Sequence, residues 1–502
     1  MENCISFSFL KTFLEYARLS IASVYRYEVV MNPEGDMRKG IRLIASVLAG
    51  AIFMLNTGIT SYAEEITYLL EEDIEKTTAD GKEKEPKEIK KEIIEKAKAL
   101  PVETNALKNW TKGPEICGEA GIVMDMDNGA ILYGKSMDRK YYPASITKIM
   151  TALVALENSQ MTDTVTFSEQ SLGCQHSGYA HIAMKKDEQI NMRDALHAMM
   201  LASANEVAYA IGETVGGTYE HFVQMMNERA KELGCENTHF MNANGMFDEN
   251  HYVSARDMAL ITREAFSKSE LLEIMQTPQY TIPVTNIAQE ERTFQQKHRM
   301  MVQGKCYDPR CFGGKTGYTD QSYNTLVTAM EENGRKIVIV ILGSRDHTYE
   351  DTKALADYAF QNFEQIKITE QETAKKYSEI SETACVTIPK DVEFKDLESE
   401  LKPNGELRYF YEGNLVGVTT AKLAAEHKIE GAALKAEQQE NKAKQETKPW
   451  KMIWIILAIV LIVIALLVIL LQIRAAKKRK ERMRRRRAMQ RRRQQQLRKR
   501  DS

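Results

Sequence analysis

Residues 324–342 read Asn-Thr-Leu-Val-Thr-Ala-Met-Glu-Glu-Asn-Gly-Arg-Lys-Ile-Val-Ile-Val-Ile-Leu. Two runs of β-branched and apolar residues stand on either side of Asn333-Gly334, a pair that favours a tight hairpin turn. The second run, Lys336–Leu342, is apolar on both faces of a strand, which is typical of a strand buried on both sides. This segment therefore predicts a β-hairpin with a buried second strand.

Another hairpin is predicted earlier in the chain. Residues 122–126 and 130–133 flank Asn128-Gly129, which predicts two strands joined by a type I′ turn. Between the two hairpins, apolar residues recur every three or four positions, which predicts helices at Ile146–Leu156, 192–214 and 219–233. Helices that interrupt an antiparallel sheet, with strands from both ends of the segment, are typical of the α+β class.

The flanking segments differ in composition. Short strands such as Leu407–Glu412 and Leu415–Thr420, around a Gly413-Asn414 turn, predict a small separate β domain. Residues rich in Glu and Lys precede the α+β region and follow the β domain, and they predict a solvated, partly helical spacer and a stalk. We therefore divide the chain into an N-terminal extension with a leader (1–63), a charged linker (64–108), the α+β domain (109–365), the β domain (366–432), the stalk (433–449), a membrane helix (450–473) and a basic tail (474–502).

The pattern of a secretory signal lies near the N-terminus. A basic stretch begins at Met37, an apolar run covers Leu43–Leu55, and the small-x-small sequence Ser61-Tyr62-Ala63 follows. This signal begins unusually deep in the chain, and Met37 directly precedes its basic residues. We therefore expect translation to start at Met37; the alternative is an unusually long basic region.

A membrane helix is predicted near the C-terminus. Met452–Leu471 carries no charge and is long enough to cross a hydrocarbon core of about 30 Å. Residues 474–502 carry 16 Lys and Arg, which predicts a cytoplasmic C-terminus and an extracytoplasmic α+β domain in a single-pass protein of the cell membrane. The tail is expected to contact anionic membrane lipid. We predict no nucleic-acid binding, because the tail has no aromatic residues for base stacking.

Composition narrows the remaining possibilities. The 502 residues are 43% hydrophobic and 27% charged with a net charge of −2, which is globular rather than disordered or collagen-like. The seven cysteines are too few for a disulfide scaffold, although Cys306 and Cys311 are close enough to pair, and pairing and free thiols remain equally open. The nine histidines show no metal-ligand spacing, so we predict no metal and no cofactor.

Three short motifs follow one another in the α+β region: Ser145-Ile-Thr-Lys148, Ser203-Ala-Asn205 and Lys315-Thr-Gly317. Each alone is weak, since a serine before a helix is usually a cap. Together they form the set found in penicillin-binding proteins and class A β-lactamases. Because Ser145 and Lys148 are three residues apart at a helix start, they are expected on one face.

The chemistry explains the residue types. A serine hydroxyl needs a base, and a lysine can be that base if burial and a second cation lower its pKa. We expect Lys315 to be that cation and also to bind a substrate carboxylate. His251 is the other base that we considered, but a packing role is the preferred interpretation.

The sequence around the motifs resembles the low-molecular-mass penicillin-binding proteins that are D-alanyl-D-alanine carboxypeptidases. The similar blocks are Tyr142–Leu153, Met200–Asn205, Met226–Asn242, Asn244-Gly245, Ser254–Met258 and Gly314–Asp320. The resemblance covers residues 109–365 and, more loosely, the β domain to about residue 432. It implies a β-lactamase/transpeptidase-like α+β domain with a serine-type carboxypeptidase activity on the peptidoglycan stem pentapeptide. β-Lactam antibiotics would acylate the same serine.

The resemblance also implies roles for single residues. Ser145 would be the nucleophile and Lys148 its general base, while Ser203 would relay a proton between Lys148 and the leaving amine. The substrate would be held by Asn205, Lys315 and Thr316, along the strand that continues through Gly317 and Tyr318. The backbone N–H groups of Ser145 and Tyr318 would form the oxyanion hole.

This chain departs from the family pattern in three places. Glu206 stands where the family often has Asp, Gln321–Asn324 replaces a usual Ala-Gly, and a full membrane span replaces an amphipathic anchor. Two other functions compete with the carboxypeptidase. A class A β-lactamase would need a glutamate motif between 203 and 315 that we do not find, and a catalytically weak sensor or scaffold would not need every catalytic residue.

Overall fold

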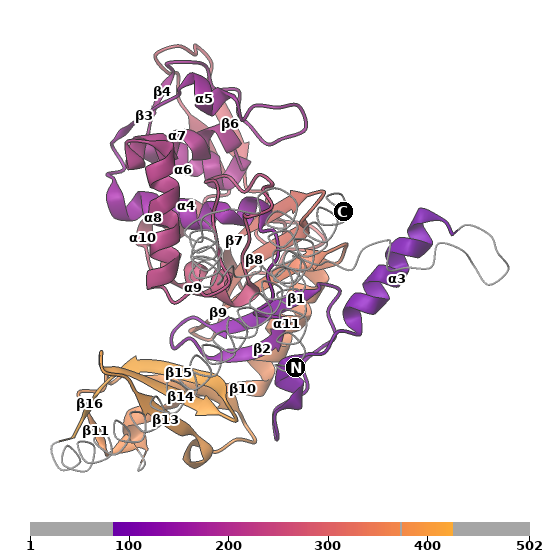
Figure 1. Ribbon diagram of the computed structural model, residues 1–502, viewed down its shortest axis with the longest axis vertical. Helices are drawn as coiled ribbons and strands as arrows, with labels where there is room; N and C mark the ends of the chain where they lie inside the picture. The colour runs from indigo at the N-terminus through magenta and orange to yellow at the C-terminus, as the bar shows by residue number, and fades with distance from the viewer. Residues whose placement is uncertain (1–83, 372–373, 425–502) are drawn as a thin grey trace, which may run out of the picture. The chain divides into compact units, whose positions relative to one another are not determined.

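Figure 1 shows the protein as a computed structural model, which describes residues 84–371 and 374–424. The predicted leader with Met37, the stalk, the membrane helix at 450–473 and the basic tail all lie outside the described residues. Within the described part of the chain, no helix is long and apolar enough to cross a membrane.

A five-stranded antiparallel sheet with the order β2-β1-β9-β8-β7 forms the centre of the α+β region. Its strands are β1 (Ala120–Asp125), β2 (Ile131–Lys135), β7 (Cys311–Thr319), β8 (Tyr323–Glu332) and β9 (Arg335–Ser344). The β8–β9 hairpin is the one predicted from residues 324–342. Its turn residues Asn333 and Gly334 have φ values of 53° and 82°, the left-handed conformation that a type I′ turn requires.

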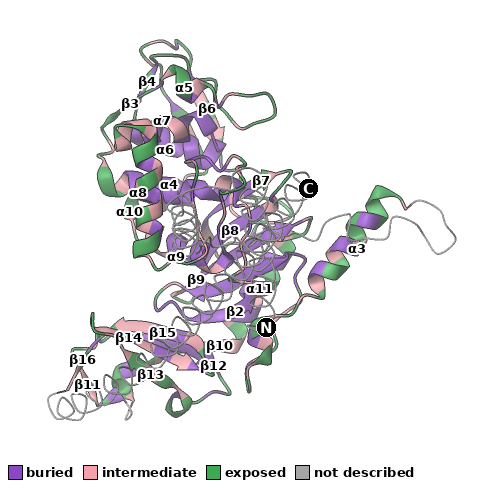
Figure 2. Ribbon diagram, in the orientation of Figure 1, coloured by how far each residue is buried: buried purple, intermediate pink, exposed green. Residues whose placement is uncertain are grey.

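α9 (Ala255–Ala265) and α11 (Thr348–Asn362) pack on the sheet, and a cluster of helices lies beside it (Figure 1). The remaining helices of the described chain are α3 (Pro86–Lys98), α4 (Lys148–Asn158), α5 (Glu169–Leu172), α6 (Met192–His197), α7 (Asn205–Gly216), α8 (Tyr219–Glu232) and α10 (Ser269–Gln276). Ile339 and Ile341 of β9 share a core cluster with Leu355 of α11. The alternate side chains of β9 point to the other face, and α9 packs on β9 and β1. Figure 2 shows the purple, buried residues concentrated in these strands and in the helix faces that meet them.

The smaller β elements lie in two groups. Within the helical part, β3 (Thr164–Thr166) pairs with β4 (Gln189–Asn191), and β5 (Gln279–Ile282) pairs with β6 (Arg292–Gln295). After α11 come β10 (Phe363–Lys367), β11 (Tyr377–Ser378), β12 (Cys385–Pro389), β13 (Glu398–Leu401), β14 (Glu406–Tyr411), β15 (Asn414–Thr420) and β16 (Lys422–Leu423). The β14–β15 hairpin is as predicted, but its turn is Glu412-Gly413, one residue earlier than expected.

The β1–β2 connection differs from the predicted type I′ turn. Gly129 has a positive φ of 73°, whereas Asn128 does not have the left-handed conformation that such a turn needs. The side chain of Asn128 accepts a hydrogen bond from Ala130 N at 2.9 Å and donates one to Thr387 Oγ1 of β12 at 2.7 Å. Asn128 therefore joins the sheet to the C-terminal β elements, a contact that local sequence does not encode.

One helical prediction also needs correction. The periodic segment 192–214 contains two helices, because a π-helical turn at Ala198–Ala202 follows α6 and Ser203 then adopts a left-handed conformation with φ of 62°. The described part of the predicted spacer contains α3 and a 3-10 turn at Glu103–Ala106. The C-terminal end of α3 is held by buried Lys135, whose Nζ donates to Ala97 O at 2.7 Å.

Candidate active site

Ser145 lies in a 3-10 turn, Ala144–Thr147, that leads directly into α4. Its hydroxyl does not cap the helix, in contrast to the ordinary role of a serine at this position. Instead, the Nζ atom of Lys148 lies 3.0 Å from Ser145 Oγ. The structure thus brings the serine and the lysine of the first motif together on one side of the turn.

The backbone of this turn is held by two distant contacts. Thr325 Oγ1 of β8 donates to Pro143 O at 2.8 Å. Gly245, with φ of 83°, packs so closely that a Cβ there would lie 1.9 Å from Ala144 O. Only glycine fits this position, and its contact fixes the peptide that precedes Ser145.

Lys148 is fully buried beneath Ser145. In addition to Ser145 Oγ, its amine meets Asn205 Oδ1 at 2.8 Å and the carbonyl oxygen of Asn244. Burial lowers the pKa of Lys148 well below its usual range, and the charge of Lys315 lowers it further. A lysine in this environment favours the neutral amine, which can accept a proton from the serine hydroxyl.

The second motif lies at the break between the π-helical turn that follows α6 and the first residue of α7. The left-handed backbone at Ser203 turns the chain, and Asn205 is the first residue of α7. Lys315 Nζ donates to Ser203 Oγ at 3.0 Å, so Ser203 is hydrogen-bonded to the lysine of the third motif. The predicted relay had paired Ser203 with Lys148, for which the structure shows no direct hydrogen bond among the described residues.

The third motif lies on β7, the edge strand of the sheet. Lys315 is buried, and its burial, together with the charge of Lys297, lowers its pKa to about 7. Thr316, Gly317 and Tyr318 follow along the strand and line the cleft. Tyr318 is 61% exposed, and its hydroxyl donates to Asp320 Oδ1 at 3.1 Å.

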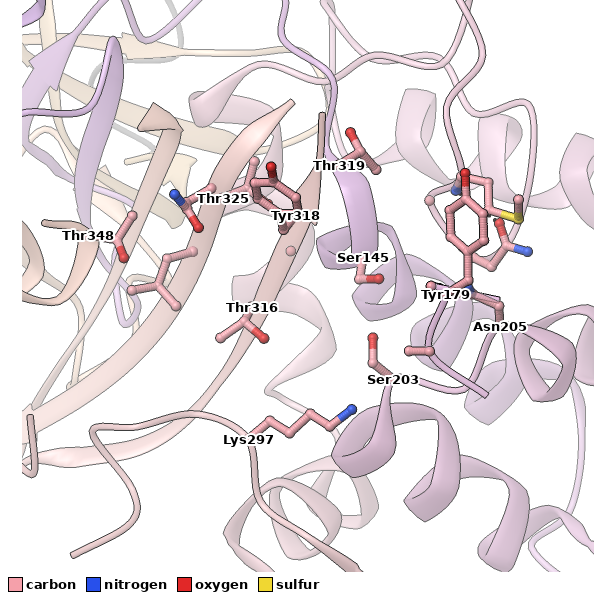
Figure 3. A pocket seen from close by; sticks show the side chains of 18 of the residues that line it. Ser145, Tyr179, Ser203, Asn205, Lys297, Thr316, Tyr318, Thr319, Thr325 and Thr348 are labelled. Atoms are coloured by element: carbon pink, nitrogen blue, oxygen red, sulfur yellow. Dashed lines mark hydrogen bonds between the residues drawn. The ribbon is translucent and has the colours of Figure 1, made fainter. Parts of the chain in front are cut away.

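These elements enclose a cleft of about 440 Å³. In Figure 3, the side chains of Ser145, Ser203 and Lys297 point toward one hollow, with Thr316 on the β7 side of it and Asn205 on the helical side. A hydroxyl beside a buried amine, with cationic groups at one end, is suited to acyl transfer on a substrate that carries a carboxylate.

Comparisons with known proteins agree with this geometry. A family model described as D-alanyl-D-alanine carboxypeptidase matches residues 107–346. The carboxypeptidase DacA of Haemophilus influenzae is 30% identical over 284 residues, which cover 54% of this chain and 69% of that protein. This chain belongs to the D-alanyl-D-alanine carboxypeptidase family. Its members are serine peptidases of cell-wall metabolism, and this carboxypeptidase is therefore a hydrolase, as predicted.

Two further similarities were found. The carboxypeptidase DacF of Bacillus subtilis is 28% identical over 319 residues, which cover 59% of this chain and 79% of that protein. Among solved structures, the DD-transpeptidase of Streptomyces K15 covers 50% of this chain and 99% of its own, with 25% identity and a TM-score of 0.47.

Sequence reasoning missed two contributors to the site of this carboxypeptidase. Lys297 lines the cleft, and its Nζ donates to Ala202 O at 2.6 Å, but it belongs to no motif. Asn244 supplies a carbonyl acceptor to Lys148, and only its place in a similar block could have drawn attention to it. Both residues reach the site because the fold places them there, and neither belongs to a sequence pattern that predicts the role.

His251 has a supporting position. It is buried, its Nε2 lies 2.9 Å from Thr147 Oγ1, and its Nδ1 accepts from Met241 N at 3.0 Å. Burial lowers the pKa of His251 to about 3, so the ring stays neutral. These contacts agree with a packing role and not with a base that acts on Ser145.

The other candidate chemistries find no support in the described residues. Cys306 and Cys311, for which pairing was left open, are free thiols in the structure. Within residues 84–371 and 374–424, no three His, Cys, Asp or Glu side chains are grouped so as to hold a metal ion.

A glycine substitution tests whether the Gly245 contact positions the nucleophile. In Gly245→Ala the new methyl group would push on Ala144 O, and we expect acylation by a penicillin to slow at least tenfold, because misplacement by about 1 Å can cost 10²-fold in rate. The control is Gly234→Ala, at a similar φ of 82° with nothing within 4 Å, which should acylate normally. Equal acylation rates in the two variants, measured by stopped-flow or labelling, would contradict this.

Proposed function

We propose that this carboxypeptidase removes the terminal D-alanine from peptidoglycan stem peptides ending in D-Ala-D-Ala, with Ser145 as the nucleophile. The observation that carries the proposal is the buried amine of Lys148 at 3.0 Å from Ser145 Oγ. No histidine needs to take part, because the lysine itself is the base.

Acylation follows from these positions. Lys148 takes the proton from Ser145, and Oγ attacks the carbonyl carbon between the two D-alanines. The resulting oxyanion accepts hydrogen bonds from the backbone N–H groups of Ser145 and Tyr318, and loss of one such donor typically costs about 10²–10³ in rate. When the C–N bond breaks, the proton passes from Lys148 to the leaving amine through the hydroxyl of Ser203, which must first exchange its hydrogen bond with Lys315 for one with Lys148. Water then hydrolyses the ester through the same base.

The terminal carboxylate is bound at the cationic end of the cleft. Lys315 and the hydroxyl of Thr316 hold it, and Lys297 adds a second positive group nearby. The amide of Asn205 orients the substrate backbone from the helical side. A β-lactam presents a carboxylate and a reactive carbonyl in the same relation, so it acylates Ser145 as well.

Two observations favour the carboxypeptidase over its competitors. Among the described residues, those that line the cleft include no Asp or Glu, so the cleft offers no carboxylate to activate a deacylating water as in a class A β-lactamase. The complete set of catalytic side chains disfavours a weak sensor or scaffold. Turnover distinguishes these functions directly.

The primary test is release of D-alanine from a pentapeptide that ends in D-Ala-D-Ala. The purified wild-type chain should release D-alanine catalytically, and Ser145→Ala should reduce the rate by at least 10³-fold because the acyl-enzyme cannot form. Ser159→Ala, at the other end of α4, is the matched control and should keep the wild-type rate. A folded wild-type protein that binds penicillin but releases no D-alanine would contradict the proposal.

The two lysines predict a bell-shaped pH dependence of kcat/KM. The rate rises with pH as Lys148 loses its proton, because only the neutral amine is a base. It falls as pH rises through about 7, the pKa of Lys315, because the neutral form of Lys315 no longer attracts the substrate carboxylate. Lys315→Arg keeps its charge, so its descending limb should move to higher pH by more than one unit. An unmoved descending limb would contradict this assignment.

We further propose that the chain is anchored by residues 450–473 with its active site outside the cell membrane and its basic tail against anionic lipid inside. The support is the uncharged run Met452–Leu471 and the basic residues that follow it. After an alkaline carbonate wash, the full chain should sediment with membranes and a chain ending at residue 449 should not. Sedimentation of both chains would contradict the anchor.

A further inference from the structure

The turn between β7 and β8 lies at the rim of the cleft. β7 ends at Thr319 and β8 begins at Tyr323, so residues 320–322 alone connect the two strands. Tyr318 and Thr319, the last residues of β7, line the same cleft as Ser145 (Figure 3). The conformation of this turn therefore bears directly on the end of the strand that meets the nucleophile.

Ser322 has a fully buried side chain in this turn. Its Oγ accepts hydrogen bonds from Thr319 N and Thr319 Oγ1, both at 2.9 Å. Its own proton has Tyr323 O at 2.9 Å as the nearer acceptor and Thr319 O at 3.4 Å as the farther one. A hydroxyl has one proton to donate and two lone pairs, so this one is fully used. Ser322 thus bridges the last N–H of β7 and the first carbonyl of β8.

This serine lies in one of the places where the chain departs from the pattern of its family. Gln321–Asn324 replaces a usual Ala-Gly, and neither alanine nor glycine has a hydroxyl. The bridge between Thr319 and Tyr323 is therefore made by a side chain that the family pattern does not supply. Its role has to be read from the contacts of this chain.

The turn keeps its shape against local backbone strain. Tyr323 has a φ of 54°, a conformation that is unfavourable for a residue with a Cβ atom. From outside the turn, the guanidinium of Arg345 lies 3.0 Å from the centroid of the Tyr323 ring, and Arg345 also pairs with buried Glu119 at 3.3 Å. From inside, the Ser322 hydroxyl binds the carbonyl of Tyr323. The turn is thus held from both sides.

The bond from Thr319 N determines which way the preceding N–H points. Successive residues of an antiparallel strand direct their N–H groups to opposite edges of that strand. Because the N–H of Thr319 points into the hairpin toward Ser322, the N–H of Tyr318 points away from β8, to the free edge of β7. This N–H is one of the two donors that the proposed function assigns to the oxyanion.

The residue before Tyr318 restrains the backbone little. At Gly317 a Cβ would clash with Thr325 Oγ1 and would lie 2.9 Å from Ser145 N, so only glycine fits there. Glycine also has the widest choice of backbone angles. The hydrogen bond from Thr319 N to Ser322 supplies a restraint on the other side of Tyr318.

We propose that Ser322 is a positioning residue whose hydroxyl holds the end of β7 so that the N–H of Tyr318 is aimed at the developing oxyanion. This inference rests on the proposed function, which makes that N–H an oxyanion donor. Ser322 acts through the peptide of Thr319 and does not touch the reacting atoms. Its contribution therefore belongs to the transition state and not to substrate binding.

The test examines the acyl-enzyme that the purified full chain forms with a penicillin. One readout is the rate constant of acylation. The other is the infrared stretching frequency of the ester carbonyl, identified with penicillin that carries ¹³C at the β-lactam carbonyl. A hydrogen bond to the carbonyl oxygen weakens the C=O bond and lowers this frequency. Both readouts come from molecules that become acylated, so neither depends on the folded fraction.

Ser322→Ala removes the bridging hydroxyl. We expect acylation to slow about tenfold or more, since complete loss of an oxyanion donor costs about 10²–10³ in rate, and the carbonyl band to move to higher frequency. With a peptide that ends in D-Ala-D-Ala, kcat should fall by a similar factor while KM stays within twofold of wild type. Ser322→Gly removes the same hydroxyl without adding atoms and should give the same results.

The matched control is Ser254→Ala. Ser254 is also fully buried, and its Oγ also accepts a backbone hydrogen bond, from Asp257 N at 3.1 Å, but it lies at the start of α9. Loss of its hydroxyl removes a comparable buried contact away from β7. We expect its acylation rate to stay within twofold of wild type and its carbonyl band to keep the wild-type frequency.

Several results would overturn the inference. An unchanged carbonyl band in the Ser322 variants would do so even if acylation were slow, because that is the result of a merely structural role. The same band shift in Ser254→Ala, or failure of both Ser322 variants to fold, would do so as well. A wild-type chain that penicillin does not acylate contradicts the proposed function and this inference with it. A normally acylated wild type with an unchanged band in the variants contradicts this inference alone.

Discussion

Two lysine side chains are buried beside Ser145, and the free energy of burying them governs the chemistry of the cleft. Among the described residues, Lys148 and Lys315 meet hydroxyl, amide and carbonyl oxygens but no carboxylate within hydrogen-bond distance. A charged ammonium in such a place loses hydration without gaining a hydrogen-bonded counter-charge, so the pKa falls. The desolvation cost of burying a charged lysine therefore favours the neutral amine, and a neutral amine can deprotonate a serine.

The sheet topology determines where this amine meets a substrate. β7 is the last strand in the order β2-β1-β9-β8-β7, so one edge of its backbone is free within the sheet. A free edge is normally a hazard, because another extended chain can pair with it. Here the first motif approaches that edge so closely that a Cβ at Gly317 would lie 2.9 Å from Ser145 N. An extended peptide added along β7 would therefore pass directly over the nucleophile.

Local patterns predicted the elements whose conformation depends on nearby residues. The Asn333-Gly334 hairpin and the Ser145–Lys148 spacing belong to this group, and the three motifs do meet in one cleft. The break of the helix at Ser203 could not be predicted in this way, because residues 192–214 have continuous helical periodicity. The partner of the Ser203 hydroxyl is Lys315, which lies 112 positions later in the chain. Asn128 and Lys297 escaped prediction for the same reason, since each acts through a partner that only the folded chain supplies.

The two lysines divide substrate binding and proton transfer between them. A carboxylate bound beside Lys315 favours the charged form of that lysine, because an opposite charge stabilises an ammonium. The charge of Lys315 in turn lowers the pKa of Lys148. The bound carboxylate carries the opposite charge and offsets this effect, so the neutral state of Lys148 depends first on its burial. A molecule without a carboxylate would lose the attraction of Lys315 even if its carbonyl reached Ser145, so one lysine contributes to selectivity and the other to catalysis.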